Sequence, residues 1–457
     1  MRFAVSKKEV VEGASIKEAT NPSNLVFRLA TIFVIGLSYW YIDHNWEASS
    51  LSHLSTESYT GDENYTADKL SQVNTMSTVF RLVLAMWGCV SFVIAPKSKL
   101  RTSSPLLWCF GAVGLILFAS ILWSERPTQT LFKLTVLLTM IIAAVGVAAA
   151  LSLREFFNAI TIVCVGFILI GVVAEIAQGY FRPSADYRFI GTTHPNTEAI
   201  YASMLCLTAR MFLDKLSRTN LLGVSIFVFG LIVVWYTKSR TTLAGLLFSL
   251  LATQTLVMRG SNRVLLIAGF LLAASVGLVG LSIISQSSSG SLGELATMGR
   301  KDDVSSLSGR LPLWEELLSS INKRPILGYG YLAYWDAKRV ESLSATFHWE
   351  IPHGHNLYLD TMLDIGIVGL GLVILAIMVA LSESARYYSL HGLIEYAILF
   401  GLIVYGVING FAESLFKLPG FPLFVALTGC FIMLKERRET LPRSRVFGSV
   451  RVGSAGS

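Results

Sequence analysis

The sequence predicts an all-α, polytopic integral membrane protein with about 12 transmembrane helices and one large extracytoplasmic loop that carries short helices. Of its 457 residues, 53% are hydrophobic and only 15% are charged, whereas soluble domains carry roughly 25% charged residues. The apolar residues form runs of about 16 to 21, long enough to cross a bilayer. Basic residues are concentrated in alternate loops. This composition argues against a water-soluble enzyme. The net charge of +7 is explained by basic loops on one side of the membrane, so no nucleic-acid partner is predicted.

The predicted spans divide evenly between the two halves of the chain. In the N-terminal half they are 25–42, 78–95, 106–123, 131–150, 159–179 and 199–213. In the C-terminal half they are 221–236, 243–258, 264–284, 366–381, 392–411 and 421–434. Four of them are short for a hydrocarbon core of about 30 Å, which is why the count is given as about 12.

Loop charges predict that both termini are cytoplasmic. An even number of spans places the tails, residues 1–24 and the basic 435–457, on one side. The loops on that side carry Lys97, Lys99, Arg101, Lys215, Arg218, Arg259, Arg263 and Arg386. Short loops rich in Lys and Arg stay in the cytoplasm. The transmembrane domain, residues 25–434, therefore presents its large loop at 285–356 to the periplasm.

The large loop has its own structure after a Ser-rich linker at 286–291. Apolar residues recur there at helical spacing, with Pro312 in the first turn and Pro325 just beyond the end. These residues are Leu311, Trp314, Leu317, Leu318 and Ile321. The spacing predicts an amphipathic helix that lies along the membrane face and roofs a cavity. Long structured loops are usually functional.

Two kinds of chemistry find no support in the sequence. The chain has no Gly-Lys-Ser/Thr phosphate loop, so ATP-driven transport within it is not expected. It also has no Cys/His group with metal-ligand spacing, so neither a metal nor another cofactor is predicted.

Cations and histidines remain at the predicted outer face. Lys238 and Arg240 lie in a very short loop, Arg310 begins the amphipathic helix and Arg324 ends it, and His355-Asn356 lies where the loop re-enters the membrane. Arginine matches phosphate oxygens with a planar fork, and histidine suits general-base work near neutral pH. This set fits a lipid-linked phosphate substrate. The simpler alternative is that the arginines anchor the span ends and that the histidine is a solvated loop residue.

The same residues resemble a known family. His355-Asn356, nine further residues and Gly366-Ile-Val-Gly369 resemble the His-Asn-x9-Gly-x-x-Gly signature of the O-antigen ligase and O-antigen polymerase superfamily (Wzy/WaaL type). Ser239-Arg240-Thr241 resembles that family's first arginine motif. Its second arginine region is similar to Gly309-Arg310 with Trp314, followed by Arg324-Pro325-Ile-Leu-Gly328-Tyr-Gly330. The overall pattern is most similar to ExoQ-like exopolysaccharide polymerases.

This resemblance implies a metal-independent glycosyltransferase of the bacterial inner membrane. Its donor is a glycan on undecaprenyl pyrophosphate, and a chain-length regulator is a further expected partner beside the lipid bilayer. By the resemblance, Arg240 and Arg310 bind the pyrophosphate and His355 activates the acceptor hydroxyl. Lys238, Arg324 and Asn356 are further candidate substrate-binding residues.

Three functions stay open at this point. A polymerase transfers the glycan to another lipid-linked repeat unit, and a ligase transfers it to lipid A–core oligosaccharide or to a protein hydroxyl. A transporter or flippase would move the same lipid-linked glycan, but transporters usually hold ionisable groups near the bilayer midplane and are built from repeats. The basic cluster at one face favours an enzyme, and a polymerase is preferred over a ligase.

Overall fold

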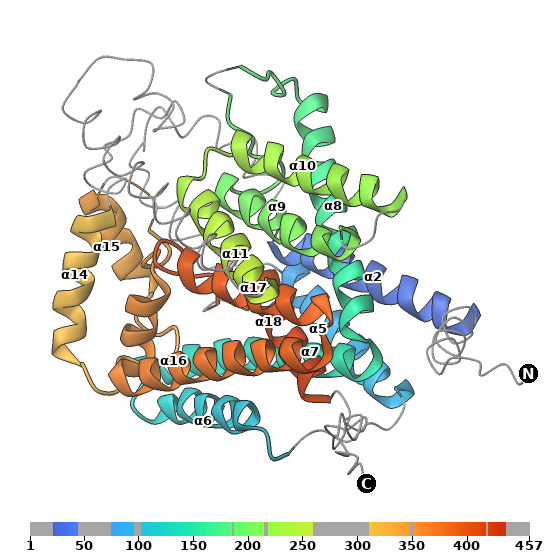
Figure 1. The fold of residues 1–457 in the computed structure, drawn as a ribbon. Helices are drawn as coiled ribbons and strands as arrows, with labels where there is room; N and C mark the ends of the chain where they lie inside the picture. The colour runs from blue at the N-terminus through green and yellow to red at the C-terminus, as the bar shows by residue number, and fades with distance from the viewer. Residues whose placement is uncertain are drawn as a thin grey trace, which may run out of the picture.

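The computed structural model describes residues 22–43, 75–95, 102–184, 187–213, 218–258, 310–347, 349, 351–416 and 419–435. Within these ranges the chain is all-helical, as predicted (Figure 1). The N-terminal half forms α2 (Pro22–Asp43), α5 (Thr75–Ile94), α6 (Pro105–Ala119), η1 (Ser120–Leu122), α7 (Pro127–Ala150), α8 (Leu153–Ala177), α9 (Pro195–Ala209) and η2 (Arg210–Phe212). The C-terminal half forms α10 (Arg218–Tyr236), α11 (Arg240–Val257), α14 (Arg310–Lys323), α15 (Ala337–Phe347), α16 (Leu357–His391), α17 (Ile394–Asn409) and α18 (Phe421–Lys435).

The structure does not confirm the count of about 12 spans. In its described part, 6 helices are long and apolar enough to cross a membrane, and they lie in α2, α5, α6 with η1, α7, α8 and α16. Three apolar helices, α10, α17 and α18, are shorter. The helix α9 coincides with a predicted span, but 15 residues extend only about 22 Å, less than the hydrocarbon core. The predicted span 264–284 and residues 285–309 of the large loop lie outside the described residues.

The main core forms where α2, α8, α9 and α18 meet. Four aromatic side chains from these helices, Tyr39, Phe167, Tyr201 and Phe421, lie with ring centroids 5.1 to 5.9 Å apart. Edge-on and tilted aromatic pairs at such distances stabilise a core beyond the area they bury. This core joins the first and last helices of the described chain.

Polar residues at helix starts determine where the helices begin beside the site. Asn356 caps α16 by accepting hydrogen bonds from the backbone N–H groups of Tyr358 and Leu359. His194 caps α9, because its Nδ1 accepts from the N–H of Asn196 at 3.2 Å, and Pro195 follows at the first helical position. Such caps satisfy N–H groups that have no partner within the helix.

A kink in α16 receives the segment that follows α14. Ile365 and Gly366 are non-helical, and Gly366 has φ 66. The freed carbonyls of Leu363 and Asp364 accept hydrogen bonds from the N–H groups of Tyr329 and Gly330. A Cβ on Gly366 would lie 2.0 Å from the carbonyl oxygen of Ile326, so only glycine permits this approach. The segment Arg324–Gly330 and the Gly366–Gly369 motif therefore pack directly against each other.

The helix α14 forms as predicted, but its apolar face packs against protein instead of the membrane. Leu313, Leu317 and Ile321 are buried in a second core that also contains residues of α15 and α16. Figure 1 shows α14 and α15 side by side at one end of the molecule. Leu311 and Leu318, which the spacing placed on the apolar face, are exposed. The helix therefore belongs to a small domain that covers the start of α16.

Candidate functional site

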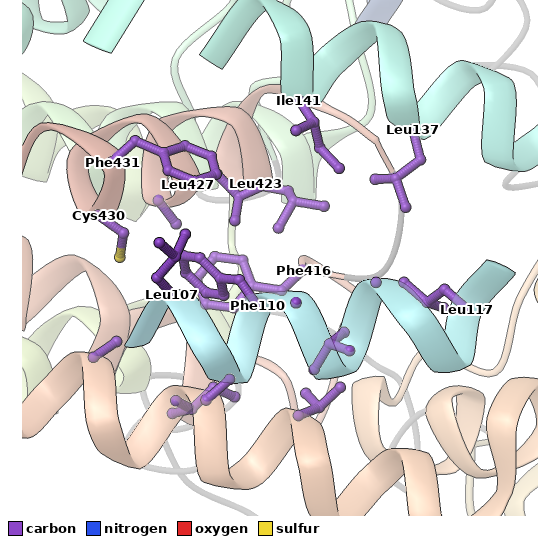
Figure 2. Close-up of a pocket in the computed structure, with 18 of the residues that line it drawn as sticks. Leu107, Phe110, Leu117, Leu137, Ile141, Phe416, Leu423, Leu427, Cys430 and Phe431 are labelled. Carbon is purple, nitrogen blue, oxygen red and sulfur yellow. The ribbon is translucent and has the colours of Figure 1, made fainter. Parts of the chain in front are cut away.

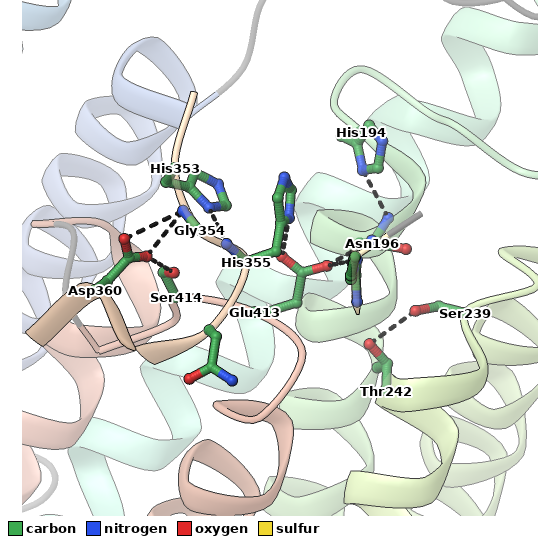
Figure 3. Close-up of polar contacts among 12 residues, drawn as sticks. His194, Asn196, Ser239, Thr242, His353, Gly354, His355, Asp360, Glu413 and Ser414 are labelled. Atoms are coloured by element: carbon green, nitrogen blue, oxygen red, sulfur yellow. Dashed lines mark hydrogen bonds and ion pairs between the residues drawn. The ribbon is translucent and has the colours of Figure 1, made fainter. Parts of the chain in front are cut away.

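Two loops bring the predicted histidine to a carboxylate from the far end of the sequence. Residues 353–356 precede α16, and residues 410–416 follow α17. The loops are joined by a hydrogen bond from the N–H of Leu357 to the carbonyl of Gly410, at 2.8 Å. Figure 3 shows His355 and Glu413 facing each other between these loops, with His194 and Asn196 of the α9 start beside them.

Glu413 is the centre of the site. Its Oε1 accepts hydrogen bonds from Asn196 Nδ2 at 2.7 Å and from an Arg310 terminal nitrogen at 2.9 Å. Its Oε2 lies 3.3 Å from His355 Nδ1. These four residues, the Glu413 cluster, come from α9, α14 and the two loops, so the site exists only in the folded protein.

The charges around Glu413 keep it ionised. Burial alone would raise the pKa of this carboxyl. The hydrogen bond with His355 and the charges of His355, Arg310 and His353 outweigh burial and lower the pKa to about 2. An ionised carboxylate only accepts hydrogen bonds, so Nδ1 of His355 must donate to it. In the tautomer that donates from Nδ1, the lone pair of a neutral ring is on Nε2, a buried atom that bonds to none of the described residues.

Asp360 joins the two loops from beneath. This fully buried carboxylate accepts hydrogen bonds from the N–H of Gly354 at 3.1 Å and from Trp335 Nε1 at 2.8 Å. Its other oxygen accepts from the Ser414 hydroxyl. His355 itself has φ 46, a left-handed conformation that costs of order 1–3 kcal/mol for a non-glycine residue. The Asp360 contacts hold the loop in that conformation, with the imidazole against Glu413.

His194 adds a second imidazole at the edge of the site. Burial lowers its pKa to about 4, and the charges of Arg188, His355 and Arg310 act in the same direction, while Glu413 opposes them. His194 is therefore neutral near pH 7. Because its Nδ1 accepts from Asn196, the proton of the neutral ring is on Nε2.

The turn that contains Lys238 and Arg240 lies against the chain leading to His194. The carbonyl of Thr237 accepts from Arg188 Nε at 3.0 Å, and the carbonyl of Tyr236 accepts from the N–H of Phe189 at 2.8 Å. Lys238 is buried and has φ 54, and Arg240 begins α11 half-buried. These contacts join the turn to the segment 187–194, which leads to His194.

Two predicted substrate-binding residues have structural partners. Arg324 pairs with Glu125 at 3.1 Å and lies over the Tyr329 ring, in a charged network with Arg339 away from the Glu413 cluster. Asn356 uses its side-chain oxygen to cap α16 and donates through Nδ2 to the carbonyl of Phe411 at 3.2 Å. Its observed contacts hold the site's backbone together.

Glu413, Asp360 and Asn196 are site residues that were not predicted from the sequence. Glu413 and Asp360 are carboxylates placed in or next to apolar segments, a pattern that is costly unless the group is paired. A carboxylate in an apolar segment was therefore the sequence signal for Glu413 and Asp360. It did not identify the residues that they contact, because Glu413 is 58 residues from His355 in the sequence.

The site also contains a group of potential metal ligands. His353, His355 and Glu413 each offer one ligand atom, and these atoms lie within 4.8 Å of one another. The oxygens of Glu413 already face Asn196, Arg310 and His355, and a guanidinium beside a cation would repel it. The contacts therefore fit a histidine–carboxylate pair better than a metal centre.

Together, the fold and the site define a polytopic membrane protein whose described part is all-helical and holds a largely buried arginine–carboxylate–histidine arrangement. Comparison with known proteins agrees with the motifs. The O-antigen ligase family model (Wzy_C) matches residues 225–374. The chain is 23% identical over 395 residues to the exopolysaccharide production protein ExoQ of Rhizobium meliloti (strain 1021), covering 80% of this chain and 89% of that protein. The resemblance predicted from the sequence is confirmed, and a polysaccharide polymerase or ligase type of role is supported.

Proposed function

We propose that this protein is a polysaccharide polymerase that transfers a glycan from undecaprenyl pyrophosphate to a lipid-linked repeat unit at the periplasmic face. The observation that carries the proposal is the contact of His355 Nδ1 with Glu413, itself paired with Arg310. This arrangement leaves Nε2 of His355 as a base and keeps a guanidinium within the same cluster. In this proposal Arg310 binds the pyrophosphate and His355 activates the acceptor hydroxyl.

The proposed reaction needs one proton acceptor and one site for negative charge. The acceptor hydroxyl oxygen attacks the anomeric carbon of the donor sugar and passes its proton to His355 Nε2. The bond between that carbon and the pyrophosphate oxygen breaks, and the pyrophosphate leaves with the electron pair. Arg310 and Arg240 stabilise the developing phosphate charge, while Glu413 stabilises the imidazolium.

Purified protein in liposomes should transfer glycan with undecaprenyl-pyrophosphate glycan as the sole substrate, and excess EDTA should leave the rate unchanged. The measurement is polymer length on a gel. A loss of activity that Mg²⁺ or Mn²⁺ restores would contradict metal independence and make His353, His355 and Glu413 a metal site.

The acceptor distinguishes polymerase from ligase in the same assay. The similarity to a protein named for exopolysaccharide production favours a polymerase, whereas the matched family model is described as O-antigen ligase. Polymer formed from the donor alone supports the polymerase. Transfer only after lipid A–core is added supports the ligase, and movement of the lipid across the bilayer without transfer supports a transporter. A chain-length regulator stays a prediction.

The proposed orientation places both termini in the cytoplasm and α15 in the periplasm. Lys338→Cys on the exposed surface of α15, in a chain whose five native cysteines are replaced, should react with an impermeant thiol reagent in cells with a permeabilised outer membrane. Ser444→Cys in the C-terminal tail should react only after the inner membrane is also opened. The reverse pattern would overturn the orientation and the periplasmic site.

A further inference from the structure

Two imidazoles beside Glu413 hold their ring protons on opposite nitrogens. His355 donates from Nδ1 to Glu413, so the lone pair of its neutral ring is on Nε2. His194 instead accepts at Nδ1 from the N–H of Asn196, at 3.2 Å. A nitrogen that accepts carries no proton, so the N–H of His194 is on Nε2. One ring therefore presents a base, and the other presents a neutral hydrogen-bond donor.

Both rings belong to one region of the site. Asn196, whose N–H orients the His194 ring, donates from its side chain to Glu413 at 2.7 Å. His194 also interacts electrostatically with His355 and Arg310 of the Glu413 cluster. Figure 3 shows the two imidazole rings on the same side of the contact between Asn196 and Glu413. One bound molecule can therefore reach both rings.

The donor of His194 is open to such a molecule. No described residue accepts a hydrogen bond from Nε2, and His194 is exposed. The contact at Nδ1 fixes the direction of the ring, because turning it over would place the N–H against the N–H of Asn196. The free N–H therefore has a set direction before any substrate binds.

The segment that carries His194 is held by two buried carboxylates. Glu175 of α8 accepts hydrogen bonds from two consecutive N–H groups of the segment, each at 2.8 Å. Glu198 of α9 accepts from the Thr193 hydroxyl at 3.1 Å. A Cβ on Gly191 would lie 2.5 Å from Oε1 of Glu198, so the segment is closely packed there. Binding to His194 therefore costs little ordering of the chain.

A large cavity elsewhere in the described part offers a sugar few partners. It has a volume of about 760 Å³ and lies among α6, α7, α16 and α18, and Figure 2 shows apolar side chains such as Phe110, Leu427 and Phe431 lining it. A sugar among these side chains would leave its hydroxyls without hydrogen bonds, which is costly. His194 does not line this cavity. The sugar is therefore expected on the α9 side of the Glu413 cluster.

A neutral N–H suits a sugar hydroxyl. Phosphate oxygens are matched by the charged fork of a guanidinium, whereas a neutral imidazole brings no charge to them. Sugars carry hydroxyls on neighbouring carbons. When one hydroxyl gives its proton to Nε2 of His355, its neighbour can accept from Nε2 of His194. The two rings then fix the sugar at two points.

We propose that His194 binds the acceptor sugar, donating from Nε2 to the hydroxyl next to the one that attacks and so aligning the attacking hydroxyl with Nε2 of His355. The inference rests on the proposed function for the identity of the acceptor, and on the opposite ring tautomers for the two roles. His194 is then a specificity-determining residue. It selects acceptors whose terminal sugar carries hydroxyls on adjacent carbons.

Two substitutions separate a contact with the sugar from the helix cap. His194→Asn keeps an oxygen that can cap α9, since asparagine is among the best N-cap residues, but it removes the Nε2–H. His194→Gln can place an amide N–H near the former Nε2, and it is not a preferred cap. A role in the cap alone predicts that the Gln variant is the more impaired. Acceptor binding predicts the reverse order.

The kinetic test uses a donor whose terminal sugar is blocked and an acceptor repeat unit joined to its lipid by a non-cleavable phosphonate. We expect His194→Asn to raise the KM for the acceptor about 10-fold, the effect of losing one hydrogen bond. Donor affinity should stay unchanged, kcat should change less than KM, and His194→Gln should raise KM less. His391→Asn, the same change at the far end of α16, is the matched control and should keep the KM. A weaker donor affinity with an unchanged acceptor KM, or a Gln variant more impaired than the Asn variant, would overturn the proposal.

A second measurement does not require transfer. The repeat-unit oligosaccharide, released from its lipid, should bind the unmodified protein in saturation-transfer NMR, with the strongest signals from its terminal sugar. Binding should weaken in the His194→Asn variant and persist in His391→Asn. No binding to the unmodified protein, or equal binding to the His194→Asn variant, contradicts the contact. If the unmodified protein transfers no glycan but this difference in binding holds, the proposed function fails and sugar binding at His194 stands.

Discussion

Replacing His355 with alanine is expected to lower the rate of glycan transfer about 10²- to 10⁴-fold, the usual contribution of a general base. Donor binding should be nearly unchanged, because the imidazole contacts Glu413 and the acceptor rather than the pyrophosphate in the proposed site. The measurements are donor affinity and polymer length at matched protein level. His391→Ala, at the far end of α16, is the matched control and should leave both unchanged.

The arginine variants provide the contrast. Arg310→Ala should weaken donor binding as well as turnover, and Arg240→Lys should still impair transfer because an ammonium cannot reproduce a bidentate contact. Full-length polymer from the His355→Ala variant would contradict the general-base role and make His353 the next candidate. Normal binding and normal polymerisation in all three variants would mean that the site lies elsewhere.

Glu413→Gln is expected to lower kcat about 10³- to 10⁴-fold, the scale seen when a carboxylate that orients a catalytic histidine becomes an amide. The glutamine amide can donate to Nδ1 of His355, which moves the ring proton to Nε2 and removes the base. Glu413→Asp keeps the charge and should retain part of the activity. Single-turnover rates and donor affinity separate this effect from a loss of binding.

Glu341→Gln on α15 is the control, because it removes a negative charge outside the Glu413 cluster. This variant should behave as the unmodified protein. The pKa of Glu413 is lowered to about 2 and that of His194 to about 4. Neither group changes charge between pH 5 and 9, so the pH profile in that range should not report on them. A Glu413→Gln enzyme with unchanged kcat would show that Glu413 only holds the loops together.

The sequence by itself determined the local features of this protein. Runs of apolar residues predicted the helices, because backbone groups inside a bilayer must bond within their own segment. The spacing of Leu317 and Ile321 predicted α14, and His355-Asn356 marked the start of α16. Each depends on neighbours a few residues away, which is why a single sequence was sufficient. The number of membrane crossings was beyond its reach, since a short apolar run such as α9 can be covered by protein as well as by lipid.

The tertiary structure decided which residues share the site. Glu413 reaches His355 and Arg310 only after α16 and α17 pack together, and nothing local in the sequence encodes that distance. Arg324, which the sequence analysis proposes as a substrate-binding residue, pairs with Glu125, a partner 199 residues away in the sequence that no local pattern indicates. A motif preserves spacing along the chain, whereas charge pairing and close packing depend on separation in space. Only the folded chain fixes that separation.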